Sequence, residues 1–435
     1  MRILLVNPWI YDFSAYDFWV KPLGLLYISK ILKNLGHEVF LIDALDRLHP
    51  SVKNITPRSN EFGCGHYYKK EVPKPEILKN IPRKYKIYGM PEDIFIDELK
   101  KIPEPEIVLV TSGMTYWYKG AFEVIEIVKK HFPDSFVVLG GIYATLCYEH
   151  AEKYSGADLV FAESDIKELL KKIGIESPLI PLSFSDYPMP DFDIYPELEY
   201  VCLRTSVGCV FNCSYCAVRF LNPKFEQKSS DKIVNEIGYF VKKLKVKNVV
   251  FYDDALLFNS KNHIEKILSE IIEKNLNCYF HTPNGLHAKY ITKELACLMY
   301  KSGFVFPRIS LETSSLKLQK TTGNKVTNED LTFAIENLCS AGYKNEHIVV
   351  YIMIGLPEQE LADVEETIDF LKKLKVRISL SEYSPIPHTF DWEKLYIDDS
   401  VDPLLHNNSV FSLNLYGEKL QKIKDMVKLH NSSLV

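Results

Sequence analysis

The sequence has no long apolar run, no low-complexity tract and no excess of basic residues. No stretch reaches the roughly 18 consecutive apolar residues that a membrane-spanning helix needs, and the apolar strand after Arg2 is too short for a secretion signal. The formal charge of -5 at pH 7 creates no general attraction to nucleic acid or to anionic membranes. We therefore expect a cytoplasmic, globular protein with no membrane span and no evident nucleic-acid partner.

Cysteine is also scarce, and it is unevenly distributed. Three of the nine cysteines fall in the segment GCVFNCSYC, residues 208–216. In a reducing compartment, clustered thiols bind metal or do redox chemistry more often than they form disulfides. A structural zinc site needs a fourth ligand, but neither a second close cysteine pair nor a His-x3-5-His pair follows. A 4Fe-4S cluster on Cys209, Cys213 and Cys216 would leave one iron open, which suits a site that binds a ligand.

The first 175 residues alternate apolar strands with amphipathic helices. Strand patterns cover 2–7, 38–43, 107–112, 135–141 and 158–163, and helical patterns cover 24–36 and 120–132. This alternation predicts a parallel sheet covered on both faces, hence a Rossmann-like domain over 1–175 whose ligands lie at the carboxyl ends of the strands. Residues 47–105, rich in Pro, Lys and Tyr, form an insertion that we expect to be a structured flap or a partner surface.

A second α/β block follows a linker. Residues 176–199 hold five prolines and no regular period, as a linker does. Over 200–395, six strand patterns alternate with helical patterns, which predicts a partial (β/α)6 TIM-like barrel with its working groups at the carboxyl ends of the strands. The three cysteines come directly after the first of these strands. Residues 396–435 are expected to form a short helical tail.

The barrel block carries motifs at several strand ends. Besides CxxxCxxC with Tyr215 before its last cysteine, the motifs are FYDD (251–254), SLETSS (310–315), IMIGLPEQ (352–359) and EYSPIP (382–387). Together they resemble the radical S-adenosylmethionine (SAM) superfamily over nearly all of 200–395. The resemblance implies that an open cluster iron chelates SAM, that an electron cleaves its S–C bond, and that the resulting 5'-deoxyadenosyl radical removes a hydrogen from the substrate.

The resemblance also assigns roles to single residues. It implies that Tyr215 lies near the adenine, Glu312 near the ribose or the methionine end, and the backbone of Gly355 and Leu356 against the adenine. Structural readings stay open for two of them, because Tyr215 fits ordinary packing and Glu312 fits an ion pair at the barrel end.

Two further strand ends hold polar candidates. Asp253 and Asp254 occupy the region of the GGEP-like turn that the family usually has, so either carboxylate is a candidate partner of the SAM ammonium, and both fit a structural role equally. Asn284, between His281 and His287, is a candidate contact of SAM or a residue that closes the barrel. The segment 388–392 is a candidate substrate contact.

The first block resembles the cobalamin-binding branch of this superfamily over 1–195. The motifs that carry the resemblance are KPLGLLYISKILKNLGHEV, the strand end VVLGG and the linker segment PDFDIYP. The resemblance implies that Ser112, Gly140 and Gly141 cradle the nucleotide tail of cobalamin. A residue without Cβ lets a bulky ligand approach a strand end, which is why glycine suits this place.

The DxHxxG motif, which donates an axial histidine to cobalt in many cobalamin proteins, is absent. Its place is taken by NPWIYDFSAYDFW, which holds neither His nor Cys, so we expect no histidine from this loop on the lower face of the corrin. The aromatic residues of the loop fit apolar walls of a cofactor site, and they equally fit plain core packing. Cys64 and His66 are the nearest alternative ligand types, and both also fit an ordinary turn.

These observations favour an enzyme that uses a 4Fe-4S cluster, SAM and cobalamin to methylate an unactivated carbon of a small molecule, lipid or peptide. An external electron donor of the flavodoxin or ferredoxin type is implied. Three alternatives remain: a cobalamin-bound radical enzyme that performs a rearrangement, cyclisation or coupling; a cobalamin-free radical enzyme whose first domain is an empty relic; and a non-catalytic iron-sulfur or zinc module.

Overall fold

The computed structural model describes residues 1–434, which divide into two compact units. The first unit comprises Met1–Val201 together with Asp398–Asn407, and the second comprises Cys202–Ile397 together with the residues from Asn408. Both units alternate strands and helices around parallel sheets, which confirms the predicted α/β class. Within residues 1–434, no helix has both the length and the apolar character that crossing a bilayer would require.

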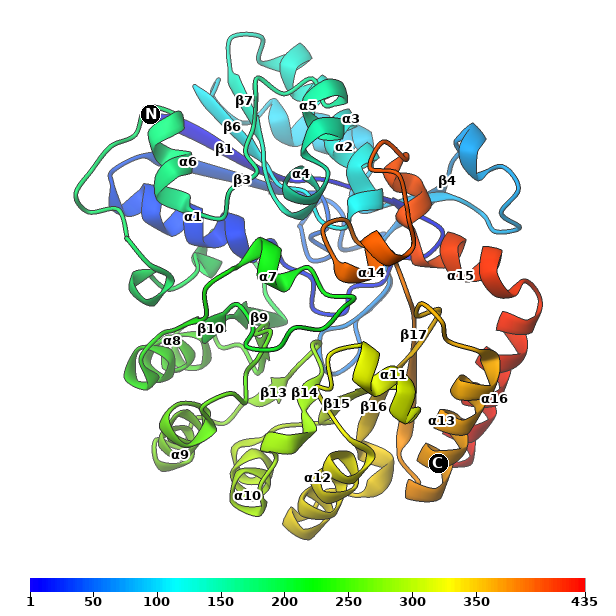
Figure 1. Cartoon of the computed structure of the whole chain (residues 1–435). Helices are drawn as coiled ribbons and strands as arrows, with labels where there is room; N and C mark the ends of the chain where they lie inside the picture. Colours follow the sequence, from blue (N-terminus) through cyan, green and yellow to red (C-terminus); the bar gives the residue numbers. More distant parts are fainter. Residues whose placement is uncertain (435) are drawn as a thin grey trace. The chain divides into compact units, whose positions relative to one another are not determined.

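The first unit is built on a five-stranded parallel sheet (Figure 1). In spatial order its strands are β3 (Glu38–Asp43), β1 (Arg2–Asn7), β6 (Ile107–Val110), β7 (Phe136–Leu139) and β8 (Leu159–Val160). The helices α1 (Leu23–Asn34) and α6 (Ile166–Lys172) share a buried apolar cluster with one face of the sheet. The strand order reverses beside β1, so the Rossmann-like expectation is confirmed, and ligands of such sheets bind beyond the carboxyl ends of β1 and β6.

The insertion is folded, and it packs against the loop that follows β1. Its strands β4 (Lys69–Glu71) and β5 (Lys86–Tyr88) form an antiparallel sheet with β2 (Ile10–Asp12), which lies within that loop. The helix α2 (Glu92–Leu99) ends the insertion. Tyr67 and Tyr88 are buried beside Ile10, so the aromatic side chains hold the insertion in place rather than facing solvent.

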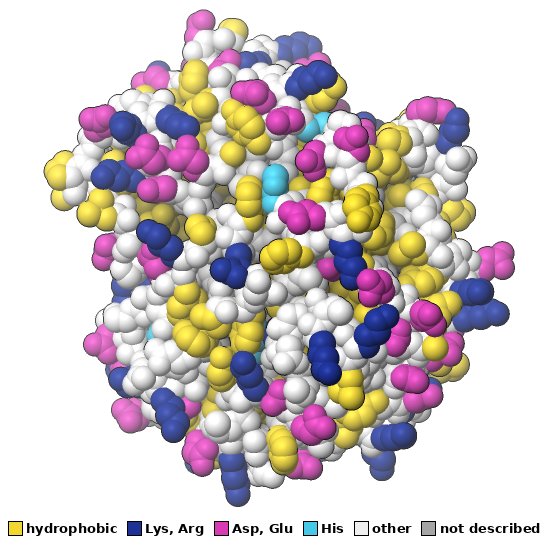
Figure 2. Space-filling view, viewed as in Figure 1, with side chains coloured by type: hydrophobic (Ala, Val, Ile, Leu, Met, Phe, Trp, Pro, Cys, Tyr) yellow, Lys and Arg dark blue, Asp and Glu magenta, His cyan; other side chains and the backbone are white. Residues whose placement is uncertain are grey.

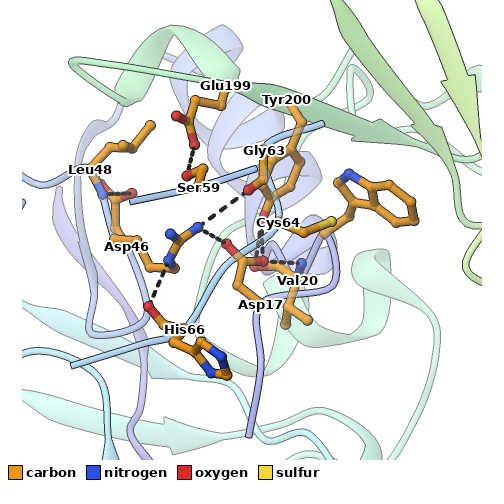
Figure 3. A network of polar contacts seen from close by, with 12 residues as sticks. Asp17, Val20, Asp46, Leu48, Ser59, Gly63, Cys64, His66, Glu199 and Tyr200 are labelled. Carbon is orange, nitrogen blue, oxygen red and sulfur yellow. Dashed lines mark hydrogen bonds and ion pairs between the residues drawn. The ribbon is translucent and has the colours of Figure 1, made fainter. Parts of the chain in front are cut away.

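A buried arginine fastens the two segments together (Figure 3). The Arg47 guanidinium donates to Asp17 Oδ2 at 3.3 Å and to the carbonyl oxygens of Gly63 and His66. Tyr200 donates from its hydroxyl to the other oxygen of Asp17 at 2.7 Å. A Cβ on Gly65 would lie 2.0 Å from Arg47 Nη2, so only glycine leaves room for this contact.

The second unit holds six strands that lead into helices, as predicted (Figure 1). The strands are β9 (Tyr200–Leu203), β12 (Asn248–Phe251), β13 (Tyr279–His281), β15 (Arg308–Glu312), β16 (Val349–Ile354) and β17 (Arg377–Glu382). The helices after the first five are α8 (Ser230–Lys242), α9 (Ile264–Glu273), α10 (Lys293–Ser302), α12 (Asn328–Ala341) and α13 (Leu361–Leu374). The parallel arrays β9-β12-β13 and β14-β15-β16-β17, where β14 is Leu286–His287, form the partial barrel.

The C-terminal residues take part in both units. Asp402 accepts a hydrogen bond from the Tyr118 hydroxyl at 3.1 Å, and Asn407 donates to Asp12 Oδ1 at 2.9 Å, both inside the first unit. The helices α15 (Asn408–Tyr416) and α16 (Lys419–Ser433) belong to the second unit. Asn431 on α16 bonds to both the N–H and the C=O of Ile378, so it satisfies the outer edge of β17 as a neighbouring strand would.

Candidate functional site

The three clustered cysteines lie on a loop at the carboxyl end of the first barrel strand. The loop follows the short strand β10 (Ser206–Val207), which pairs with β11 (Glu226–Gln227). Gly208 opens the loop with φ +77°, and a Cβ there would lie 2.4 Å from the carbonyl oxygen of Lys224. The sharp turn therefore needs glycine, and it directs the chain from the sheet into the cysteine segment.

The three thiols are close enough to perturb one another. The pKa of Cys216 is raised to about 12, mainly by burial, with contributions from the neighbouring Cys213 and Cys209. Burial also raises the pKa of Cys209, and Cys213 adds to that effect. Within residues 1–434, no three His, Cys, Asp or Glu side chains approach closely enough to hold a single metal ion.

Contacts with three other segments hold the cysteine loop. The backbone N–H of Ser214 donates to the carbonyl oxygen of Thr322 at 3.3 Å, and the carbonyl oxygen of Ser214 accepts from the N–H of Asp391 at 3.0 Å. Phe211 stacks on His287 with ring centroids 4.4 Å apart. These contacts fix the loop through the protein alone, which is the preorganisation that a metal-binding loop needs.

A lysine that the sequence analysis did not single out stands beside the cysteines. Lys325 Nζ lies 2.8 Å from Glu312 Oε1 and 3.1 Å from the Tyr215 hydroxyl. Burial alone would lower the pKa of Lys325, but Glu312 and Cys213 outweigh it and raise that pKa above its usual value. Burial raises the pKa of Cys213, and the positive charge of Lys325 next to the thiols opposes that rise.

Glu312 adopts a conformation that is unusual for its residue type. It ends β15 at φ +67°, where the register with β16 shifts between Ser310 and Glu312. A non-glycine residue in the left-handed region costs free energy and persists where surrounding structure holds it, often at functional sites. The bulge turns the carboxylate of Glu312 toward Lys325 and Tyr215. Lys325 thereby links Glu312 and Tyr215, which are both predicted site residues.

The adjacent carboxylates Asp253 and Asp254 have different surroundings. Asp253 is buried and accepts hydrogen bonds from the N–H and hydroxyl groups of Thr205 and Ser206, at 2.6–3.1 Å. Asp254 Oδ2 is buried and has no hydrogen-bond partner among the described residues. Burial raises the pKa of Asp254 to about 6, and its charge raises the pKa of both Cys209 and Cys216. Asp253 thus ties β9 to β12, while Asp254 keeps an open acceptor near the thiols.

The remaining barrel candidates already have backbone or side-chain partners. Asn284 is exposed, and its amide donates to the carbonyl oxygens of Tyr252 and Asp253, at 3.3 and 3.1 Å. The N–H groups of Gly355 and Leu356 both donate to Gln359 Oε1, at 2.8 and 3.2 Å. Asn284 therefore braces the loop beside β12, and Gln359 shapes the turn after β16 by occupying its N–H groups.

The three candidates in the first unit meet at the carboxyl ends of β6 and β7. Ser112 donates from its hydroxyl to the Gly140 carbonyl at 2.6 Å and accepts from the Ala144 N–H at 3.2 Å. Gly141 has φ +95°, and a Cβ there would lie 2.4 Å from the Ser112 carbonyl oxygen. A Cβ on Gly140 would find 3.7 Å of clearance, so the steric need for glycine falls on Gly141.

The loop after β1 has an ordered interior of its own. Trp9 and Trp19 are 1% and 2% exposed, and Trp9 packs on Phe95 with ring centroids 4.7 Å apart. Both tryptophans therefore belong to the core of the unit, as the structural reading of the sequence had it. Cys64 is buried, whereas His66 is exposed and has its ring beside Tyr16 at 4.9 Å.

Comparison with known proteins gives the family of the second unit. The family model described as Radical SAM superfamily matches residues 203–371, from the end of β9 to the helix that follows β16. This range contains the cysteine loop, both aspartates, Glu312 and Lys325. Residues 203–371 of this chain therefore form a radical SAM domain. The expectation drawn from the cysteine spacing is therefore confirmed at the level of the family.

Relatives of this radical SAM protein in sequence carry two kinds of name. A Pyrococcus horikoshii protein named uncharacterized methyltransferase PH0819 is 24% identical in an alignment that covers 71% of this chain and 73% of the relative. The threonylcarbamoyladenosine tRNA methylthiotransferase MtaB of Aquifex aeolicus is 23% identical over 60% of this chain and 66% of the relative. Methyl transfer and methylthio transfer thus both occur in the names of similar proteins.

Solved structures share the fold of both units. The radical SAM methyltransferase TsrM from Kitasatospora setae, solved with cobalamin and a 4Fe-4S cluster, matches 100% of this chain and 91% of its own at 15% identity and a TM-score of 0.67. The cobalamin-dependent radical enzyme OxsB, solved with aqua-cobalamin and SAM, matches 99% of this chain and 56% of its own at 16% identity and a TM-score of 0.58. The predicted combination of a cobalamin-binding-type unit and a radical SAM barrel is therefore confirmed as a fold.

Proposed function

We propose that this radical SAM enzyme transfers a methyl group from cobalamin to an unactivated carbon. The observation that carries the proposal is the pairing of two sites, each at the carboxyl edge of its own sheet. One is the three-cysteine loop with Lys325 and Asp254, and the other is the cradle of Ser112 and Gly141. Ligands of both sheet types bind at these edges.

The residues of the barrel fit a cluster with one open iron. Cys209, Cys213 and Cys216 would hold it as thiolates, and the positive charge of Lys325 lowers the free energy of that negative charge in a buried place. What the bound cluster supplies is an iron that chelates SAM and an electron that cleaves its S–C bond. Supply of that electron from outside the chain is part of the proposal.

Asp254 is the carboxylate that suits the SAM ammonium. Its Oδ2 has no hydrogen-bond partner within residues 1–434, and its charge lies close enough to the thiols to raise the pKa of Cys216, whereas the oxygens of Asp253 are engaged by Thr205 and Ser206. A buried acceptor without a donor costs free energy, and a bound ammonium removes that cost. Glu312 and Tyr215, joined by Lys325, are assigned to the nucleoside side of the same ligand.

The first unit fits the nucleotide tail of cobalamin. Gly141 and the Ser112 hydroxyl shape the ends of β6 and β7, so that no Cβ obstructs the strand edge. What the bound cobalamin supplies is a transferable methyl group. The loop after β1 offers no histidine to cobalt, and its pairing with the insertion would keep it in place beside a bound cobalamin.

The decisive experiment is anaerobic reconstitution with iron and sulfide, followed by product analysis with SAM. We expect 5'-deoxyadenosine, a substrate that gains one methyl mass and, over repeated turnovers with cobalamin present, S-adenosylhomocysteine from the second SAM that would restore the methyl group to cobalamin. The variant Cys216→Ala should abolish both products, and Cys339→Ala, outside the loop, should abolish neither. 5'-Deoxyadenosine without S-adenosylhomocysteine would contradict methylation and favour a rearrangement, cyclisation or coupling; the absence of iron would contradict the whole proposal.

A further inference from the structure

The surface around the cysteine loop differs in charge from the rest of the chain. Three segments joined by contacts, 208–225, 286–290 and 315–325, hold six basic side chains and no acidic one. In the whole chain, the 57 Asp and Glu residues outnumber the 52 Lys and Arg residues. These three segments therefore carry a net positive charge on a protein that is negative overall, while the segment 388–394, which also contacts the loop, adds the acidic Asp391 and Glu393 and the Lys394 that pairs with Glu358.

Most of these cations lack a neutralising partner. Within residues 1–434, Arg219, Lys224 and Lys320 are exposed and form no ion pair. Lys289 is exposed too, and its ammonium lies 4.4 Å from the centroid of the Phe211 ring on the cysteine loop. Exposed, unpaired charges of one sign raise the rate at which a partner of opposite charge arrives.

Apolar side chains lie among these cations. Val210 on the cysteine loop is 42% exposed, Phe220 is 46% exposed and Leu316 is 62% exposed. Phe220 lies on α7 (Val218–Leu221) and Leu316 on α11 (Leu316–Thr321), and both basic and apolar side chains are visible on the face that carries these helices (Figure 2). Exposed apolar groups flanked by charges are the composition of a protein-docking surface.

We propose that this surface, formed by Val210, Arg219, Phe220, Lys224, Lys289, Leu316 and Lys320, docks an acidic one-electron donor protein of the flavodoxin type. The inference rests on the proposed function, because it assumes that Cys209, Cys213 and Cys216 hold an iron-sulfur cluster. A flavin hydroquinone in the donor gives up one electron, and the oxidised cluster accepts it, so the flavin is oxidised and the cluster is reduced. Charge complementarity and closeness to the loop both favour this occupant over a neutral substrate.

The test measures cluster reduction in the reconstituted protein, with reduced flavodoxin as the probe and dithionite as a small chemical reductant. For Arg219→Glu and Lys320→Glu, singly and together, we expect the second-order rate constant with flavodoxin to fall about tenfold or more at low ionic strength. Dithionite should reduce the same variants at the wild-type rate. The difference between variant and wild type should shrink as salt is added, because salt screens exposed charges.

The matched control places the same charge change at the opposite edge of the barrel. Lys301 ends α10 and Lys373 lies in the last turn of α13, both ahead of the amino ends of strands. Lys301→Glu with Lys373→Glu should leave the flavodoxin rate within about twofold. Equal slowing by the control, an unchanged rate in the surface variants, or equal slowing with dithionite would each overturn the docking surface. A protein that binds no reducible cluster would instead contradict the proposed function, and this is seen before any donor is added.

Discussion

The two adjacent aspartates after β12 should respond in opposite directions to the same substitution. Asp253→Asn replaces one oxygen by an amide N–H2 that faces the N–H and hydroxyl donors of Thr205 and Ser206, which now bond at 2.6–3.1 Å. Loss of a buried, charge-assisted acceptor costs about 2–4 kcal/mol of unfolding free energy. Asp254→Asn removes a carboxylate whose Oδ2 has no partner among the described residues, and burial of that charge outweighs its interactions with Arg204 and the Gly208 N–H, so the substitution should not carry that cost.

The pKa of Asp254 gives the size and the sign of the second effect. Burial raises this pKa from 3.8 to about 6, so the contribution of the group to stability is complete below pH 3.8 and is lost as the pH rises through 6. A difference of about two pH units corresponds to at most about 3 kcal/mol. At pH 8, Asp254→Asn should therefore stabilise the apo-protein by about 1–3 kcal/mol.

Urea unfolding of the metal-free variants, followed by circular dichroism at pH 8 and pH 5, measures both effects. The midpoints at pH 8 should follow the order Asp253→Asn, wild type, Asp254→Asn, and the advantage of Asp254→Asn should shrink at pH 5, where the wild-type carboxyl is largely protonated. In the reconstituted protein, only Asp254→Asn should weaken SAM binding, by about tenfold, for the loss of one charged hydrogen bond. If both variants lose stability equally at pH 8, the assignment of different roles to the two carboxylates is wrong.

Three further substitutions test other parts of the structure. Gly65→Ala should lower the unfolding free energy by about 2–4 kcal/mol, because its Cβ would overlap a buried guanidinium, whereas Gly24→Ala, with no atom within 4 Å, should be neutral or slightly stabilising in urea unfolding. Lys228→Met should cost about 3–5 kcal/mol because it strands the Glu236 carboxylate, its partner at 2.9 Å, and adding Glu236→Leu should recover most of that loss in the same assay. Gly141→Ala should reduce the cobalamin retained after gel filtration, measured by absorbance, and leave SAM cleavage intact; loss of both activities would point to misfolding instead.

The fold could be predicted from the sequence because the local helix and strand signals agree with the overall alternation of strands and helices. The helical patterns expected between the strands of 200–395 correspond to helices such as α12 and α13, where apolar periodicity, a capping box and a left-handed C-terminal residue coincide. The CxxxCxxC spacing was equally local, since its three thiols lie on one short loop. Patterns of this kind are read from neighbouring residues, so no tertiary information is needed.

Residues whose roles depend on contacts between distant segments were harder to predict from the sequence. Lys325 lies in the turn between α11 and α12 and meets Tyr215, 110 positions earlier, only through the fold. Nothing in its spacing separates it from the other lysines of that segment. The contrast between Asp253 and Asp254 is of the same kind, because it depends on which carboxylate the end of β9 engages. Such roles depend on which residues the fold brings into contact, and the periodicity of the sequence carries no information about those contacts.

Buried ion pairs in both units lie at the carboxyl ends of strands, the edge at which sheets of these types bind ligands. In the first unit, Lys21 lies 3.1 Å from Asp46 and Arg47 bonds to Asp17, beyond the carboxyl ends of β1 and β3. In the second, Lys325 and Glu312 lie beyond β15 at 11% and 12% side-chain exposure. Buried ion pairs stabilise a fold little or not at all compared with well-packed apolar side chains, so stability alone gives no reason to gather them there. Their position at these two edges is explained if each ion pair holds a loop in a fixed geometry beside a charged cofactor. Apolar replacements of these ion pairs should then give variants that stay folded but bind neither ligand.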